Sequence, residues 1–421
     1  MQFGPILRAM GRNKTRIGLI VFEVALTLAI VVNCITMITE ARTKMVRPSG
    51  FADDEIVRVS SIPFEKAFRE DGYLDNSRRE DLLALRAVPG VKAVSNTSFL
   101  PWQGGGSSTE LRPAGSQGQM LRTQIYNADE STLDTLGVRV VEGRTFTREE
   151  VERDALRLRQ LYASPRVLGA DNRPSVKVSQ DVVVSQAFAR LAFGDGPALG
   201  QALEDSDGDL YRIIGTIDSF YNPYGWPIHE YVVFYPNAAR SYDGGTPYLL
   251  RTEPGQAAAV LKPVEAKLLA TNNGRNLRVQ SLSEIKRQYF SGQQVVVTMM
   301  TGVIVLLVLV TSLGIVGLTS FSVAERTRQI GTRRALGARK ADILTHFLLE
   351  NWLITTMGLA LGVALAYTLN VGLLSVVSDA KLSGALVASG VVVLWVAGLL
   401  ATLAPALRAA RISPAIATRN V

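Results

Sequence analysis

Four apolar blocks constrain this chain more than any other feature of its sequence. They run from about Ile17 to Thr39, Val295 to Phe321, Phe347 to Leu369 and Leu386 to Leu403. A helix rises about 1.5 Å per residue, so roughly 20 apolar residues cross a hydrocarbon core of roughly 30 Å. The sequence therefore predicts a membrane protein with four transmembrane helices. The first block is expected to be an uncleaved anchor rather than a signal peptide, because no convincing small-residue cleavage site follows it.

Basic residues border these blocks unevenly. Lys and Arg outnumber acids in segments 1–16, 322–345 and 405–421, which the positive-inside rule places in the cytoplasm together with both termini. The formal net charge of +8 follows from this topology, so nucleic acid is not an expected partner. The predicted order is a cytoplasmic amphipathic segment 1–16, a first crossing 17–40, an outer domain 41–281, a stalk and second crossing 282–321, a cytoplasmic loop 322–345, a third crossing 346–370, a short outer loop 371–385, a fourth crossing 386–404 and a cytoplasmic tail 405–421.

The outer domain has no apolar run long enough to cross a bilayer. Short β-branched stretches alternate with turn residues, which predicts an α+β domain inserted between the first and second membrane helices. Expected strands are Glu55 to Ser60, Val138 to Glu142, Val176 to Val184, Leu210 to Ile217 and Tyr231 to Tyr235. Expected helices are Arg79 to Ala87, Ser131 to Leu136, Ser185 to Phe193 and Gln256 to Thr271, and Glu149 to Pro174 has the composition of a solvated insertion. Ser281 and Glu284 have capping-box spacing, so a helix is expected to start near Leu282 and continue into the membrane to about Phe321.

No set of residues in this domain predicts catalysis, a cofactor or a metal. The two histidines fall on opposite sides of the membrane, and the single cysteine lies in the first apolar block. Asp205, Asp207 and Asp209 alternate like the start of a calcium loop, but no glutamate follows at the twelfth position, so an acidic turn is favoured. The sequon at Asn96 is common by chance, and the aromatic residues Phe220, Tyr221, Tyr224 and Trp226 are expected to pack beneath a loop.

The most informative stretch is the cytoplasmic loop, SVAERTRQIGTRRALGARKADI at 322–343. It resembles the loop between the second and third membrane helices of MacB/FtsX-type ABC transporter permeases, where the pattern is E-R-x-x-E-I-G-x-x-R-A-L-G-A. Gln329 stands where the family usually has an acid, so any salt bridge from that position is lost. Segments 7–16, 136–146, 182–194, 199–200, 211–217 and 405–415 resemble other parts of the same family, in the same order along the chain.

This resemblance implies that the loop couples the membrane helices to an ATPase. Gly331 and Gly337 are expected to break or cap a short helix, with Ile330 and Leu336 as apolar anchors in a groove of the ATPase and the arginines as polar contacts. The alternative is that these arginines only touch lipid headgroups. The expected coupling residues are Glu325, Arg326, Arg328, Ile330, Gly331, Arg333, Arg334, Leu336 and Gly337. Glu23 and Glu350 are acids within or near the membrane, where such residues are usually functional, although Glu23 also has the option of reaching the inner surface.

The sequence contains no G-x-x-x-x-G-K-S/T phosphate-binding loop. The expectation is therefore a non-catalytic permease of the bacterial inner membrane, with ATP and Mg²⁺ bound by a separate ATPase subunit. The resemblance also implies a second permease chain and, for export from the periplasm, an adaptor and an outer-membrane duct. The alternative is an FtsX-like signalling protein that regulates a cell-wall hydrolase. The size of the outer domain and its MacB-like segments favour export.

Overall fold

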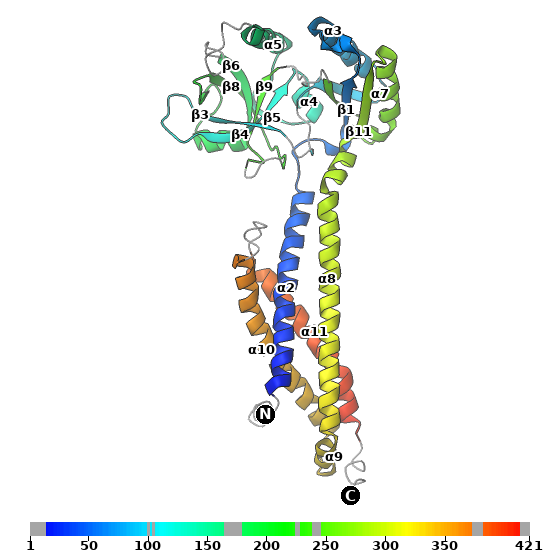
Figure 1. Ribbon diagram of the computed structural model, residues 1–421. Helices are drawn as coiled ribbons and strands as arrows, with labels where there is room; N and C mark the ends of the chain where they lie inside the picture. The colour runs from blue at the N-terminus through cyan, green and yellow to red at the C-terminus, as the bar shows by residue number, and fades with distance from the viewer. Residues whose placement is uncertain are drawn as a thin grey trace. The chain divides into compact units, whose positions relative to one another are not determined.

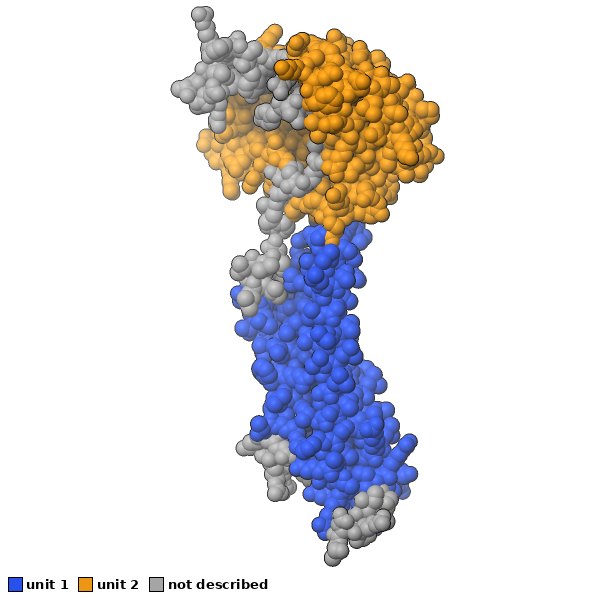
Figure 2. Space-filling view, turned by 45° about the vertical axis from the view of Figure 1, so that its right-hand side comes forward, with its two compact units in different colours: residues 1–47, 292–421 blue, residues 48–291 orange. Residues whose placement is uncertain are grey.

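The computed structural model describes residues 14–98, 102, 106–163, 179–223, 228–237, 246–372 and 382–412. The chain divides into two compact units, residues 1–47 with 292–421, and residues 48–291 (Figure 2). Most of the predicted amphipathic segment 1–16, most of the outer loop 371–385 and the end of the tail 405–421 lie outside the described residues, as do Tyr224 and Trp226.

Four long apolar helices confirm the predicted membrane segments (Figure 1). They are α2 (Lys14–Val46), α8 (Leu282–Glu325), α10 (Lys340–Gly372) and α11 (Gly384–Ala410). The short helix α9 (Thr327–Ala335) lies between α8 and α10 in the chain. Helix α11 continues through Pro405 instead of ending there, which agrees with the tolerance of membrane helices for proline.

The core of the membrane unit is built around α2. Its residues Val24, Leu28 and Val32 are at most 1% exposed, and they pack with buried residues of α8, α10 and α11. Gly358 and Gly362 explain how α10 comes so close to α2, because a Cβ at Gly362 would lie 2.9 Å from the Ala25 carbonyl oxygen. Gly358 and Gly362, which have G-x-x-x-G spacing, therefore lie at a helix contact.

The other unit is an α+β domain with two sheets. The first is antiparallel, with strand order β11-β1-β10-β2, and α3 and α7 cover it. Alternate residues of its strands, among them Val57 and Val59 on β1 and Leu250 on β10, point toward these helices, as the two-residue period of a strand requires. The bounds are β1 Ile56–Pro63, α3 Asp71–Arg86, β2 Val91–Asn96, β10 Thr246–Thr252, α7 Ala257–Thr271 and β11 Arg275–Ser281, with 3-10 turns at Asp53–Glu55 and Lys66–Arg69.

The second sheet is mixed, with strand order β5-β8-β6-β9-β4-β3-β7. Strands β6 and β8 pair in parallel, as do β4 and β9, and the buried Val182 and Val184 of β6 contact Phe188 of α6. The bounds are β3 Ser107–Pro113, β4 Leu121–Ala128, α4 Thr132–Leu136, β5 Val140–Gly143, α5 Arg148–Ala163, β6 Ser179–Ser185, α6 Gln186–Phe193, β7 Ala202–Asp205, β8 Leu210–Ile217 and β9 Val232–Pro236.

Three further expectations for this domain can be compared with the structure. The stretch predicted as a solvated insertion forms helix α5 as far as Ala163, because Val151 and Asp154, one turn apart, are both buried; residues 164–178 lie outside the described part. The acidic turn is confirmed, because Asp205 Oδ1 accepts hydrogen bonds from the backbone N–H groups of Asp207 and Asp209. Phe220 and Tyr221 are buried, as a packing role requires.

Candidate functional site

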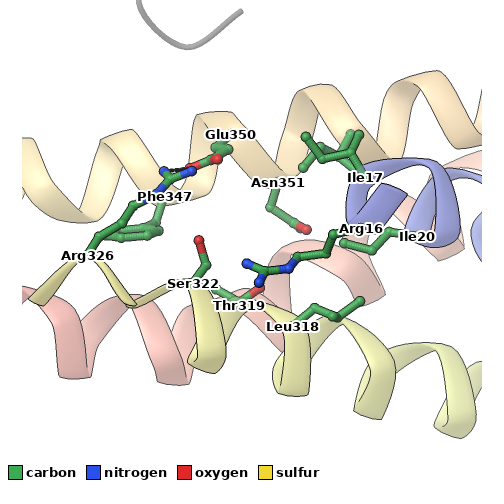
Figure 3. Close-up of a pocket in the computed structure, with 11 residues that line it drawn as sticks. Arg16, Ile17, Ile20, Leu318, Thr319, Ser322, Arg326, Phe347, Glu350 and Asn351 are labelled. Atoms are coloured by element: carbon green, nitrogen blue, oxygen red, sulfur yellow. Dashed lines mark hydrogen bonds and ion pairs between the residues drawn. The ribbon is translucent and has the colours of Figure 1, made fainter. Parts of the chain in front are cut away.

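The candidate site is the short helix α9 with its two flanking turns. Helix α8 ends at Glu325, and Arg326 adopts a non-helical conformation before α9 begins. Arg326 Nη1 donates to Glu350 Oε2 at 3.0 Å, and both side chains are less than one-fifth exposed. Figure 3 shows this ion pair across the α8–α9 turn. Because Glu350 belongs to α10, the pair ties the turn to the membrane unit.

A second ion pair joins α2 to the same turn. Arg16 Nη1 lies 3.3 Å from Glu325 Oε2, and the Arg16 guanidinium lies 4.4 Å above the ring of Phe321. Glu325 is half exposed, so the pair itself contributes roughly 0–1 kcal/mol. Sequence reasoning did not include Arg16 among the site residues, and no local pattern identifies the pair because its members are 309 positions apart.

The inner face of α9 packs against its own chain. Ile330 is 5% exposed and belongs to a cluster with Val323, Ile343 and Phe347. The expectation that Ile330 anchors an ATPase is therefore wrong for this structure, since its side chain is already buried. Gly331 is also buried and lies inside α9, so it does not break the helix as expected.

The end of α9 is a Schellman motif centred on Gly337. Its φ of +97° is the left-handed conformation that favours glycine. The Ala338 N–H donates to the Arg333 carbonyl at 3.1 Å, and the Gly337 N–H donates to the Arg334 carbonyl at 3.1 Å. These two bonds are the pattern expected when glycine follows the last helical residue. The predicted capping role of Gly337 is confirmed.

The outer face of α9 is apolar at one point and basic around it. Leu336, next to the capping glycine, is 83% exposed. Arg328 and Arg333 are also exposed, whereas Arg334 turns inward and donates to the Ile412 carbonyl. The four arginines of the predicted site thus divide into two that hold α9 in place, Arg326 and Arg334, and two that face away from the chain. An exposed leucine between arginines fits a groove that is apolar inside and polar at its rim.

The predicted intramembrane acids have different surroundings. Glu350 is paired with Arg326, as described. Glu23 lies on α2 against the backbone of α8, where a Cβ at Gly314 would come within 2.7 Å of Glu23 Oε1. The carboxylate of Glu23 therefore contacts another membrane helix rather than reaching toward the inner surface.

Other kinds of site find little support in the described part of the chain. No group of three or more His, Cys, Asp or Glu residues there is arranged to hold a metal ion. Asn96 of the sequon is 1% exposed and donates to the Pro247 carbonyl at 2.8 Å, so its amide is not accessible for glycosylation.

Two protein families match this chain. The family described as MacB-like periplasmic core domain matches residues 19–267, and the family described as FtsX-like permease C-terminal matches residues 301–414. The first match alone covers more than half of the 421 residues.

Individual relatives are distant but cover much of the chain. The macrolide export ATP-binding/permease protein MacB of Chromobacterium violaceum is 23% identical over 436 residues, which cover 98% of this chain and 61% of the relative. The uncharacterized ABC transporter permease YknZ of Bacillus subtilis is 24% identical over 376 residues, 87% of this chain and 83% of the relative. The crystal structure of the periplasmic region of MacB from Actinobacillus actinomycetemcomitans matches with a TM-score of 0.34 and 13% identity, over 58% of this chain and 97% of that one. The chain thus spans 61% of the length of the Chromobacterium relative.

Proposed function

Because this chain belongs to the family of ABC transporter permeases that combine a MacB-like periplasmic core domain with an FtsX-like permease domain, we propose that it transmits ATP-driven movement of a separate ATPase subunit to its periplasmic domain. The ATPase binds ATP and Mg²⁺, and the permease carries no catalytic residues of its own. The movement acts on a substrate that is already in the periplasm and drives its export.

One observation carries this proposal, the division of α9 into an anchored face and a free face. Ile330 and Arg334 hold the helix to the membrane unit, while Leu336, Arg328 and Arg333 remain exposed. A force applied to the free face therefore acts on the end of α8 and, through the Arg326–Glu350 pair, on α10.

Helix α8 supports transmission to the periplasmic domain. It is a continuous helix of 44 residues, and the division between the two units falls within it, after Ser291. Ser281 Oγ accepts a hydrogen bond from the Glu284 N–H at 3.3 Å, which caps the start of α8 as predicted. In the domain, Lys286 Nζ of α8 contacts Asp53 Oδ2 at 2.7 Å. A hydrogen-bonded helix with both ends anchored is suited to convey displacement along its axis.

The proposal places the chain in the inner membrane with both termini and α9 in the cytoplasm. A second permease chain, identical or similar, completes the transporter. An adaptor and an outer-membrane duct are the periplasmic partners that export requires. If the chain were instead an FtsX-like regulator, its periplasmic partner would be a cell-wall hydrolase.

The test is the substitution Leu336→Asp, with Leu83→Asp on α3 as the matched control because Leu83 is 66% exposed in the periplasmic domain. Loss of a central apolar contact in an interface costs about 2 kcal/mol or more, which weakens binding by more than about tenfold. We expect the ATPase to copurify with the wild type and with Leu83→Asp, but at least about tenfold less with Leu336→Asp. Copurification unchanged by Leu336→Asp, or no ATPase bound to the wild type, would refute coupling through α9.

A further inference from the structure

A small pocket at the α9 end of the membrane unit is not explained by coupling alone. Its volume is about 40 Å³, and α2, α8, α10 and the turn residue Arg326 line it (Figure 3). This space holds about three water-sized groups, which is too little for a nucleotide or a drug-sized molecule. A compact polar group such as a phosphate is the size of ligand that fits.

Positive charge lines this pocket from two sides. Figure 3 shows Arg16 and Arg326 at opposite ends, with Ser322 and Thr319 between them. The charge of Arg326 is balanced by the buried Glu350 at 3.0 Å. Arg16 contacts Glu325 at 3.3 Å, but Glu325 is 52% exposed and does not line the pocket, so solvent weakens that pair. A guanidinium has five N–H donors, and Arg16 therefore keeps donor capacity for an anion.

The other residues that line the pocket form a polar side and an apolar side. The hydroxyl-bearing Ser322 and Thr319 and the amide of Asn351 lie on the polar side, while Ile17, Ile20 and Leu318 form an apolar side. Phe321 of α8, whose ring lies 4.4 Å from the Arg16 guanidinium, is 56% exposed, and on the other face of α2 Leu19 and Phe22 are 62% and 59% exposed. These side chains are the surface that a bilayer would cover. The site therefore joins an arginine-bearing polar pocket to an apolar surface.

We propose that this pocket binds the phosphate of an anionic phospholipid from the cytoplasmic leaflet, with an acyl chain along the exposed Phe321 of α8. Arg16 is the principal ligand of the phosphate, and Ser322 and Thr319 donate hydroxyl hydrogen bonds. Basic pockets between membrane helices on the cytoplasmic side are suited to such headgroups. The inference rests on the proposed orientation, in which the α9 end faces the cytoplasm, but it does not require an ATPase.

The experiment is native mass spectrometry of the full chain released from nanodiscs that contain either phosphatidylglycerol or phosphatidylcholine. The variants are Arg16→Gln, Ser322→Phe, which fills the pocket while keeping both arginines, and Arg408→Ala. Arg408 is an exposed arginine of α11 that does not line the pocket, so it controls for nonspecific attraction of anionic lipid. We expect the wild type and Arg408→Ala to retain phosphatidylglycerol at least about fivefold more than either pocket variant. Arg16→Gln removes the principal ligand of the phosphate, and the ring introduced by Ser322→Phe occupies the space of the headgroup.

Three results would overturn the proposal. They are equal retention of phosphatidylglycerol and phosphatidylcholine by the wild type, undiminished retention by Arg16→Gln and Ser322→Phe, and displacement of the lipid by millimolar inorganic phosphate. The last would assign the pocket to a free phosphate. Thermal unfolding of each variant in detergent shows whether a loss of lipid reflects misfolding, and Ser322→Phe remains informative if Arg16→Gln is unstable. Failure of the ATPase to bind would leave these results unaffected.

Discussion

Helices α2 and α8 are equally apolar but have very different surroundings. Their most apolar stretches have mean hydropathy of 2.4 and 2.6, yet 50% of that stretch is buried in α2 and only 11% in α8. Helix α2 packs closely on α10 and α11, with Leu28 fully buried, whereas Leu313 of α8 is 69% exposed. Apolar character therefore places a helix in the membrane without telling which helix forms the core.

Besides the apolar packing of Ile315 in the core of the unit, two polar contacts join these helices. Thr27 Oγ1 of α2 lies 2.7 Å from Thr311 Oγ1 of α8, and Glu23 lies against Gly314. Hydrogen bonds between membrane helices are individually weak, on average about 0.6 kcal/mol. Because only 11% of the apolar stretch of α8 is buried, we expect α8 to shift at a smaller cost than α2, as a transmitting helix requires.

The largest effect is expected from a proline in α8. Val305→Pro removes a backbone donor and introduces a clash that costs about 3 kcal/mol or more, so the helix kinks. Because Val305 is 53% exposed, the bundle around α2 should remain intact. We expect transport to be lost while the associated ATPase continues to hydrolyse ATP, measured side by side in proteoliposomes, with Val305→Ala as the control. Transport that survives the proline would show that α8 does not transmit movement as a continuous helix.

A matched pair of glycines tests the packing difference directly. Gly362→Leu places a side chain against the backbone of Ala25, whereas a Cβ at Gly302 of α8 meets no atom within 4 Å. Overpacking of this kind costs about 1–3 kcal/mol. We expect Gly362→Leu to lower the thermal unfolding temperature in detergent clearly and Gly302→Leu to leave it nearly unchanged. Equal decreases in the unfolding temperature would mean that α8 is packed as tightly as α2, for instance because a second chain covers it.

The smallest effect is expected at the hydroxyl contact between α2 and α8. A double-mutant cycle with Thr27→Val and Thr311→Val should give a coupling energy of about 0.6 kcal/mol. Reversible unfolding in mixed micelles supplies the four stabilities that the cycle needs. A coupling of several kcal/mol would indicate that α8 is fixed to α2, and would remove the distinction between the two helices.

Much of the fold was predictable from local patterns. The four apolar blocks, the start of α8 at Leu282 and strand β8 at Leu210–Ile217 agree with the structure, because each depends on residues close in sequence. Strands such as β3 were missed because Ser107–Pro113 is mostly polar and buries only Leu111, so it has no alternating apolar pattern. Helix α5 was missed because its charged residues outnumber the positions, Val151 and Asp154, that are buried among its described side chains.

The candidate site was predictable only in part. Gly337 signals a helix end by its own conformational preference, whereas the anchoring role of the exposed Leu336 stays a prediction. The burial of Ile330, however, depends on Phe347 of α10 and Ala406 of α11, which are distant in sequence. The Arg16–Glu325 pair likewise joins the first membrane helix to the end of the second. Contacts of this kind leave no local pattern in the sequence.

The central claim is that nucleotide-driven movement enters at the free face of α9 and reaches the periplasmic domain. Spin labels at Leu83→Cys and Val371→Cys in a Cys34→Ser background report the distance between the two units, since both positions are exposed and Cys34 is the single native cysteine. In the reconstituted complex, the account predicts that a trapped nucleotide state shifts this distance in otherwise wild-type protein but not in Leu336→Asp. An identical shift in Leu336→Asp, or an unchanged distance while the wild type transports its substrate, would contradict it.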